Sequence, residues 1–114
     1  MHDKPLTYEI IETPREGTVI IKLVGPLTLL NLFTIQDQLR AIHPPVAIFD
    51  FTESEYMDSA GLGLLINFYT SAEKNGRTLA LAGVNHRIDA LLEMTHVKKL
   101  LNIHPTVEQA LAAV

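Results

Sequence analysis

The sequence lacks cysteine, a basic surplus and any apolar run long enough to cross a membrane. Without cysteine there are no disulfides, thiolate metal sites or cysteine nucleophile. Nine basic residues against thirteen acidic ones give a formal charge of −4, whereas nucleic-acid binders normally carry a basic surplus. A bilayer span needs about 18–20 apolar residues in a row, and the first ten residues do not have the pattern of a secretory signal. We therefore expect a cytoplasmic protein with no membrane insertion and no direct contact with nucleic acid.

What the sequence does contain is a large apolar fraction, 47% of 114 residues. A chain of this length and composition can fill one hydrophobic core, so we expect residues 1–114 to form one domain. The first five residues are polar, and we expect them to be frayed.

Hydrophobic periodicity predicts alternating strands and helices. The first two strands are separated by turn residues (14–17), which predicts a hairpin. The later alternation predicts right-handed crossovers and a mainly parallel sheet. The expected fold is therefore α/β, with a mixed, mostly parallel sheet of four to five strands and about four helices. The predicted strands are 8–13, 18–24, 46–51, 78–82 and 100–103; the predicted helices are 28–42, 59–75, 85–94 and one that begins after 106.

The most informative segment follows the predicted strand 46–51, where an acidic loop leads into a helix that begins with small residues. Ser59 occupies the expected N-cap position, Asp58 precedes it, and Gly61 and Gly63 follow in the first turns. Glycine costs up to about 1 kcal/mol inside a helix, so the two glycines indicate a close approach to the backbone. A helix N-terminus also favours anions. A phosphoryl group on Ser59, with a charge of about −1.5 to −2, would be tolerated there.

Residues 57–63, Met-Asp-Ser-Ala-Gly-Leu-Gly, resemble the D-S-x-G-L-G signature of STAS domains, specifically of bacterial anti-sigma factor antagonists. Weaker matches occur in the same order along most of the chain, from about residue 18 to residue 111. They are the strand 19–25 that ends in glycine, the strand 46–50, Gly76 before the strand 79–82, the Leu91–Leu92 pair, and the late Glu108, Ala110 and Leu111.

This resemblance implies a protein-binding switch rather than an enzyme. In that family a kinase that is also the anti-sigma factor phosphorylates the matching serine, here Ser59. The unphosphorylated antagonist binds the kinase and frees a sigma factor for transcription, and a metal-dependent serine phosphatase reverses the modification. We expect no catalytic residue, metal or cofactor. The partner-binding residues implied by the motif and its neighbourhood are Thr28, Asp58, Ala60, Gly61, Leu62, Gly63 and Leu64.

One position departs from the family pattern. Family members commonly read G-x-L-D after the second strand, and this chain has Thr28 where that aspartate stands. Threonine keeps a hydrogen-bonding oxygen but carries no charge. The departure favours an alternative, in which the domain is a constitutive scaffold subunit of a transporter or signalling assembly without phosphorylation.

Two other interpretations of the same residues have less support. Ser59 alone would suit a simple helix cap, but the surrounding motif favours a phosphoacceptor. A catalytic serine on a nucleophile elbow requires the pattern G-x-S-x-G, and Met57 stands at its first glycine. The five histidines show no metal-ligand spacing.

Overall fold

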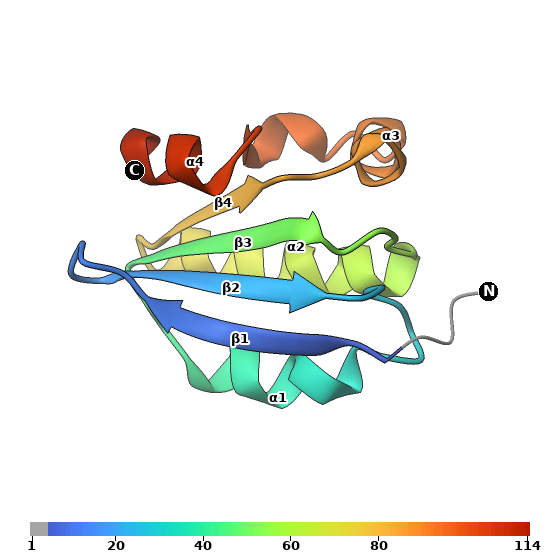
Figure 1. The fold of residues 1–114 in the computed structure, drawn as a ribbon, viewed down its shortest axis with the longest axis horizontal. Coiled ribbons are helices and arrows are strands. Elements are labelled where there is room, and N and C mark those ends of the chain that lie inside the picture. Colours follow the sequence, from blue (N-terminus) through green and yellow to red (C-terminus); the bar gives the residue numbers. More distant parts are fainter. Residues whose placement is uncertain (1–4) are drawn as a thin grey trace.

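The computed structural model describes residues 5–114 as a five-stranded sheet in the order β1-β2-β3-β4-β5 with four α-helices packed around it (Figure 1). β1 is antiparallel to β2, and every later pair is parallel, which confirms the predicted fold class. The expectation for residues 1–4 lies outside the described residues. The strands are β1 (Thr7–Glu12), β2 (Thr18–Val24), β3 (Val46–Glu53), β4 (Thr78–Ala82) and β5 (Asn102–His104); the helices are α1 (Phe33–Ala41), α2 (Ser59–Lys74), α3 (His86–Met94) and α4 (Val107–Ala113).

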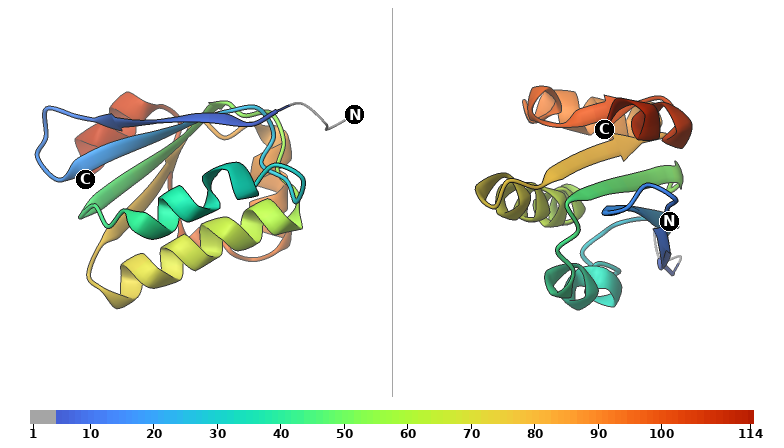
Figure 2. Two further views of the ribbon diagram at one scale, coloured as in Figure 1. Left: turned by 90° about the horizontal axis from the view of Figure 1, so that it is seen from below. Right: turned by 90° about the vertical axis from the view of Figure 1, so that its left-hand side faces the viewer.

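Helices cover both faces of the sheet, and the side chains of the central strands alternate between them. α1 and α2 lie side by side on one face, and α4 lies on the other (Figure 2). The α1–α2 side is filled by large side chains, among them Phe49, Phe51 and Leu65. The α4 side is a small cluster of Ile48, Ala80, Ala82 and Ala110, all fully buried. The strands between the two layers therefore have apolar side chains on both faces, as parallel strands usually do.

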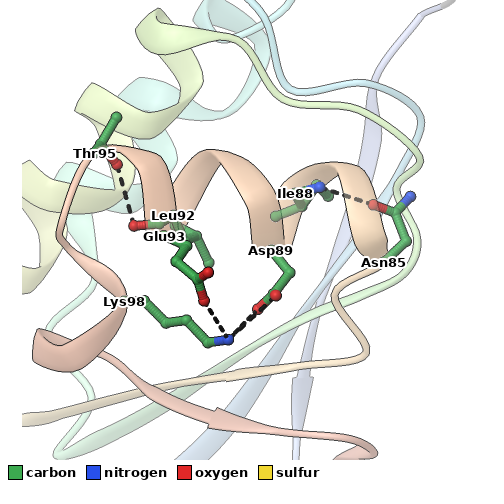
Figure 3. Close-up of polar contacts among 7 residues, drawn as sticks. All are labelled: Asn85, Ile88, Asp89, Leu92, Glu93, Thr95 and Lys98. Atoms are coloured by element: carbon green, nitrogen blue, oxygen red, sulfur yellow. Dashed lines mark hydrogen bonds and ion pairs between the residues drawn. The ribbon is translucent and has the colours of Figure 1, made fainter.

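α3 shows how local sequence fixes an element (Figure 3). Asn85, the first residue of the predicted helix 85–94, is its N-cap, because its carboxamide oxygen accepts a hydrogen bond from the backbone N–H of Ile88 at 2.9 Å. After the helix, Lys98 pairs with Asp89 at 2.9 Å and with Glu93 at 3.4 Å. The hydrogen bond to Asp89 is the largest of the effects that raise the pKa of Lys98 above 10.5. Asp89 also adds an attractive charge, and Glu93 contributes in the same two ways.

The last predicted strand was placed too early. Residues Lys98–Leu100 form a 3-10 turn, and β5 begins only at Asn102. The turn is closed by hydrogen bonds from Leu100 to Val97 and from Leu101 to Lys98, so these backbone groups are not available to the sheet. No helix within residues 5–114 is long and apolar enough to cross a membrane.

The predicted helix 28–42 was also too long at its start, since α1 begins at Phe33. Before Phe33, the backbone forms hydrogen bonds that differ from those of a helix. Leu27 makes a parallel bridge to Met57, and the N–H of Leu29 donates to the Asp58 carboxylate at 3.1 Å. A turn follows, in which the N–H groups of Asn31 and Leu32 donate to the carbonyl of Thr28. Tertiary hydrogen bonds therefore replace the first turn of the expected helix.

Candidate functional site

The N-terminus of α2 is capped by Asp58 and not by Ser59 as the sequence suggested. Asp58 has extended backbone, and its Oδ1 accepts a hydrogen bond from the N–H of Gly61 at 2.9 Å. Ser59 is consequently the first helical residue, and its side chain is exposed. Because a helix leaves its first N–H groups without intrahelical acceptors, those of Ser59 and Ala60 remain available at this end. The exposed hydroxyl therefore lies at the positive end of the α2 dipole.

The Asp58 carboxylate also joins α2 to the segment that follows β2. Its second oxygen, Oδ2, accepts from the N–H of Leu29, while the Asp58 N–H donates to the Leu27 carbonyl at 3.3 Å. One residue of the motif thus fixes both the start of the helix and the path of residues 27–29. The structure therefore brings the motif and the segment containing Thr28 together.

The loop that leads into α2 is fastened on both sides. Toward β2, the Ser54 hydroxyl donates to the Gly25 carbonyl at 2.7 Å and is buried. Toward α3, the Asn85 carboxamide donates to the Glu55 carbonyl at 2.9 Å, and the Arg87 guanidinium lies 4.9 Å from the centre of the Tyr56 ring. These contacts fix the position of the loop that precedes Ser59, and they therefore also fix the position of Ser59.

An ion pair supports the same end of the sheet. Lys22 of β2 contacts Glu53 of β3 at 2.8 Å. The hydrogen bond to Glu53 and the charge of Glu53 raise the pKa of Lys22 above 10.5, and the charges of Asp50 and Glu9 act in the same direction. The pair is partly exposed and links the strand ends that precede the site.

The two glycines of the motif serve different purposes. A Cβ on Gly61 would lie 2.2 Å from the carbonyl oxygen of Leu27, so this glycine is required by the close approach of the segment after β2. A Cβ on Gly63 would meet nothing within 4 Å, and the residue is exposed. The close approach inferred from the sequence is therefore internal at Gly61, and no contact within the described chain explains Gly63.

The comparison with family models matches residues 9–110 to the STAS domain. The chain belongs to the STAS domain family. An anti-sigma-B factor antagonist of Staphylococcus aureus is 38% identical over 53 residues, which are 46% of this chain and 49% of that protein. The match thus spans about half the length of this curated relative.

Solved structures agree with the STAS fold. An anti-sigma factor antagonist from Mycobacterium paratuberculosis superposes with a TM-score of 0.86 at 20% identity, covering 96% of this chain and 93% of that one. A sulfate transporter family protein from Wolinella succinogenes superposes with a TM-score of 0.75 at 26% identity, covering 90% and 88%. The same fold thus occurs in an anti-sigma factor antagonist and in a sulfate transporter family protein.

In this STAS domain, several of the predicted partner-binding residues are not at the surface. Thr28 is only 4% exposed, and Gly61 and Leu62 are buried. The Thr28 hydroxyl has no hydrogen-bond partner among the described residues. Asp58, Ala60 and Leu64 are half-buried, whereas Ser59 and Gly63 are exposed. The accessible part of the predicted site is therefore the first turn of α2 and not the Thr28 side chain.

Sequence reasoning missed an exposed apolar patch beside this turn, formed by Leu29, Leu30 and Phe33 (the 29–33 patch). Their exposed fractions are 57%, 77% and 66%. The patch begins at the residue that Asp58 holds. The sequence indicates this patch only indirectly: residues 27–35 contain more apolar side chains than one face of a helix can bury. Exposed apolar clusters of this kind commonly mark protein interaction sites.

Proposed function

We propose that this STAS domain, taken as one unit over residues 1–114, is an anti-sigma factor antagonist controlled by phosphorylation of Ser59. In its unphosphorylated form it binds a serine-kinase anti-sigma factor and thereby frees a sigma factor for transcription. Phosphorylation of Ser59 by that kinase releases the complex, and a metal-dependent serine phosphatase restores binding. In this proposal the protein acts in the cytoplasm, through binding and not through catalysis.

The observation that carries the proposal is the exposed Ser59 residue at the first helical position of α2, next to Asp58, which accepts a hydrogen bond from the first residue of the exposed 29–33 patch. The helix end tolerates the added phosphate charge. A partner that covers the 29–33 patch would meet the same charge at its own surface, where burying it without a counter-ion is costly. One modification can therefore abolish binding without unfolding the domain.

Gly63 supports the same surface. Because nothing in the described chain occupies the space beside it, alanine would be more stable there by about 0.5–1 kcal/mol. A partner whose backbone or flat surface packs against this turn gives a reason for the missing Cβ. The proposed interface therefore consists of Ser59, Gly63 and the 29–33 patch, with Asp58 as the residue that positions them.

The test is to incubate the protein with candidate serine-kinase anti-sigma factors and ATP and to map the phosphate by mass spectrometry. We expect modification at Ser59, retained binding in Ser59→Ala, and at least tenfold weaker binding in Ser59→Asp. Thr70→Ala, at an exposed position of the same helix, is the matched control. Absence of phosphate on Ser59 together with unchanged binding by Ser59→Asp would reject the switch.

The patch is tested separately with Leu30→Ser, which we expect to weaken the complex at least tenfold while the thermal unfolding curve stays unchanged. Met94→Ser is its control, because Met94 is similarly exposed at 71% but lies on α3. Equal affinities for the two variants would show that the patch is not part of the interface.

The second candidate function is a constitutive scaffold subunit of a transporter or signalling assembly. Two observations favour it: Thr28 is uncharged and buried, and the fold matches a sulfate transporter family protein at 26% identity. A stable complex that is indifferent to both Ser59→Ala and Ser59→Asp, with no phosphate on Ser59, would select this function.

A further inference from the structure

A cavity of about 150 Å³ lies between α1 and α2, toward the C-terminal halves of both helices. The two helices run side by side on one face of the sheet (Figure 2). Its apolar lining is formed by Leu39, Ile42, Leu64 and Phe68, and the polar side chains of Gln36, Asn67 and Ser71 also line it. The Phe68 ring is held edge-on against Phe49 of β3, with centroids 5.1 Å apart and planes at 81°. The apolar lining is therefore anchored on the hydrophobic core through Phe68.

Two arginines and a histidine are among the residues that line this cavity. They are Arg40, His43 and Arg77, and none of the residues that line it is acidic, although the whole chain has a net charge of −4. The Arg77 guanidinium donates to the Ser71 hydroxyl at 3.0 Å, so it lies along the wall of the cavity. The carboxylate paired with Arg40 belongs to Asp37, at 3.9 Å on the exposed side of α1, and leaves the arginine 70% exposed. The guanidinium groups thus retain donors for an anion.

Size and polarity together define the ligand class. A cavity of about 150 Å³ is comparable to one that holds a benzene molecule. Guanidinium groups recognise carboxylate and phosphate through paired hydrogen bonds. We propose that this cavity binds a small organic anion, consisting of one aromatic ring or a hydrocarbon group of similar size that carries a carboxylate or a phosphate monoester.

The site is separate from the proposed phosphorylation site. Its α2 residues run from Leu64 to Ser71, which are five to twelve positions after Ser59 and therefore roughly 8–18 Å along the helix axis. A ligand in the cavity would contact the same helix that carries Ser59, but neither its binding nor its measurement requires a kinase or a modified serine. Failure of one proposal therefore leaves the other untouched.

The experiment is an NMR titration of isotope-labelled protein with phenyl phosphate, with benzoate, and with benzyl alcohol as the uncharged analogue. We expect chemical-shift changes confined to the facing halves of α1 and α2, and an affinity for at least one anion at least tenfold higher than for the alcohol. A preference for phenyl phosphate or for benzoate distinguishes a phosphate from a carboxylate ligand.

Arg77→Gln and Arg40→Gln should each weaken anion binding several-fold. Lys74→Gln is the matched control, because it removes the same charge from an exposed position of α2 that does not line the cavity. Arg40 is the more exposed of the two arginines, so its variant keeps the test valid if Arg77→Gln disturbs folding. Scattered shifts, equal affinity for alcohol and anions, or equal effects of the Arg40 and Lys74 variants would overturn the proposal. If the residues that line the cavity are shielded only in a complex with another protein, the cavity is a protein contact. This result would also overturn the proposal.

Discussion

At the scale of single residues, Thr28 is the position where the chain departs most clearly from the pattern it resembles. Its side chain is buried, and its hydroxyl has no hydrogen-bond partner among the described residues. A buried hydroxyl without a partner costs about 1–3 kcal/mol relative to a satisfied one. The Thr28 side chain is therefore not accessible to a partner, and its hydroxyl does not stabilise the fold. Any effect of Thr28 on binding must act through the conformation of residues 27–33.

The first prediction follows from this orphan hydroxyl. Thr28→Val replaces the hydroxyl with a methyl group of the same shape, so we expect the free energy of unfolding to rise by about 1 kcal/mol. Chemical denaturation measures the change. Thr70→Val, at an exposed position of α2, should alter stability by less than about 0.5 kcal/mol. A loss of stability in Thr28→Val would show that the hydroxyl does have a partner.

Among the structural elements, the start of α2 contains two glycines with different surroundings. Packing requires Gly61 to lack a side chain, whereas nothing packs against Gly63. We predict that Gly61→Ala lowers the free energy of unfolding by about 1–3 kcal/mol, because its Cβ would overlap the Leu27 carbonyl oxygen. Gly63→Ala should raise it by about 0.5–1 kcal/mol, because its Cβ enters open space and alanine favours the helix. Denaturation curves of the two variants form a matched pair, and a stabilised Gly61→Ala would contradict the tight contact.

A second prediction at this scale concerns α3 and the turn that follows it. Because the pKa of Lys98 is raised in the folded protein, its pairing with Asp89 and Glu93 stabilises the folded state fully below pH 10.5. This stabilisation is lost as the pH rises through the pKa that Lys98 has in the folded protein. The stability difference between wild type and Lys98→Met should therefore be constant from neutral pH to about pH 10 and shrink above it. Denaturation across this range, with Lys99→Met as the control, measures the difference. A difference that stays constant above the raised pKa would exclude the ion pairs as its source.

Element boundaries also show what the sequence can and cannot predict. Asn85 and Thr106 belong to residue types that commonly cap helices, and each side chain accepts a hydrogen bond from a backbone N–H three residues later, so these helix starts follow from the local sequence. At α2 the sequence predicted the start of the helix at Ser59, but the cap that it assigned to Ser59 is Asp58. The start of α1, the burial of Thr28 and the 29–33 patch all depend on hydrogen bonds to residues 56–58, about thirty positions away. Local periodicity contains no information about such contacts.

At the scale of the whole molecule, the sheet separates two unequal layers. The α1–α2 layer holds the large apolar side chains, the proposed interface and the cavity. The opposite layer has one short helix, α4, packed on a floor that includes Ala80 and Ala82. Alanine side chains let the helix lie close to the strands. We therefore expect substitutions in the α1–α2 layer to affect binding, and substitutions in the α4 layer to affect stability alone.

The last prediction tests this separation with Ala80→Leu. Ala80 is fully buried beneath α4, and the added atoms cannot be accommodated without displacing the helix, so we expect a loss of about 1–3 kcal/mol. Amide hydrogen exchange should accelerate mainly in α4, while the amides of β2, β3 and α2 remain protected. Ala90→Leu, at an exposed position of α3, should change neither quantity. Because α4 belongs to the layer opposite α1 and α2, binding of phenyl phosphate and of the proposed kinase partner should persist in Ala80→Leu. Loss of either would mean that the two layers are coupled through the sheet.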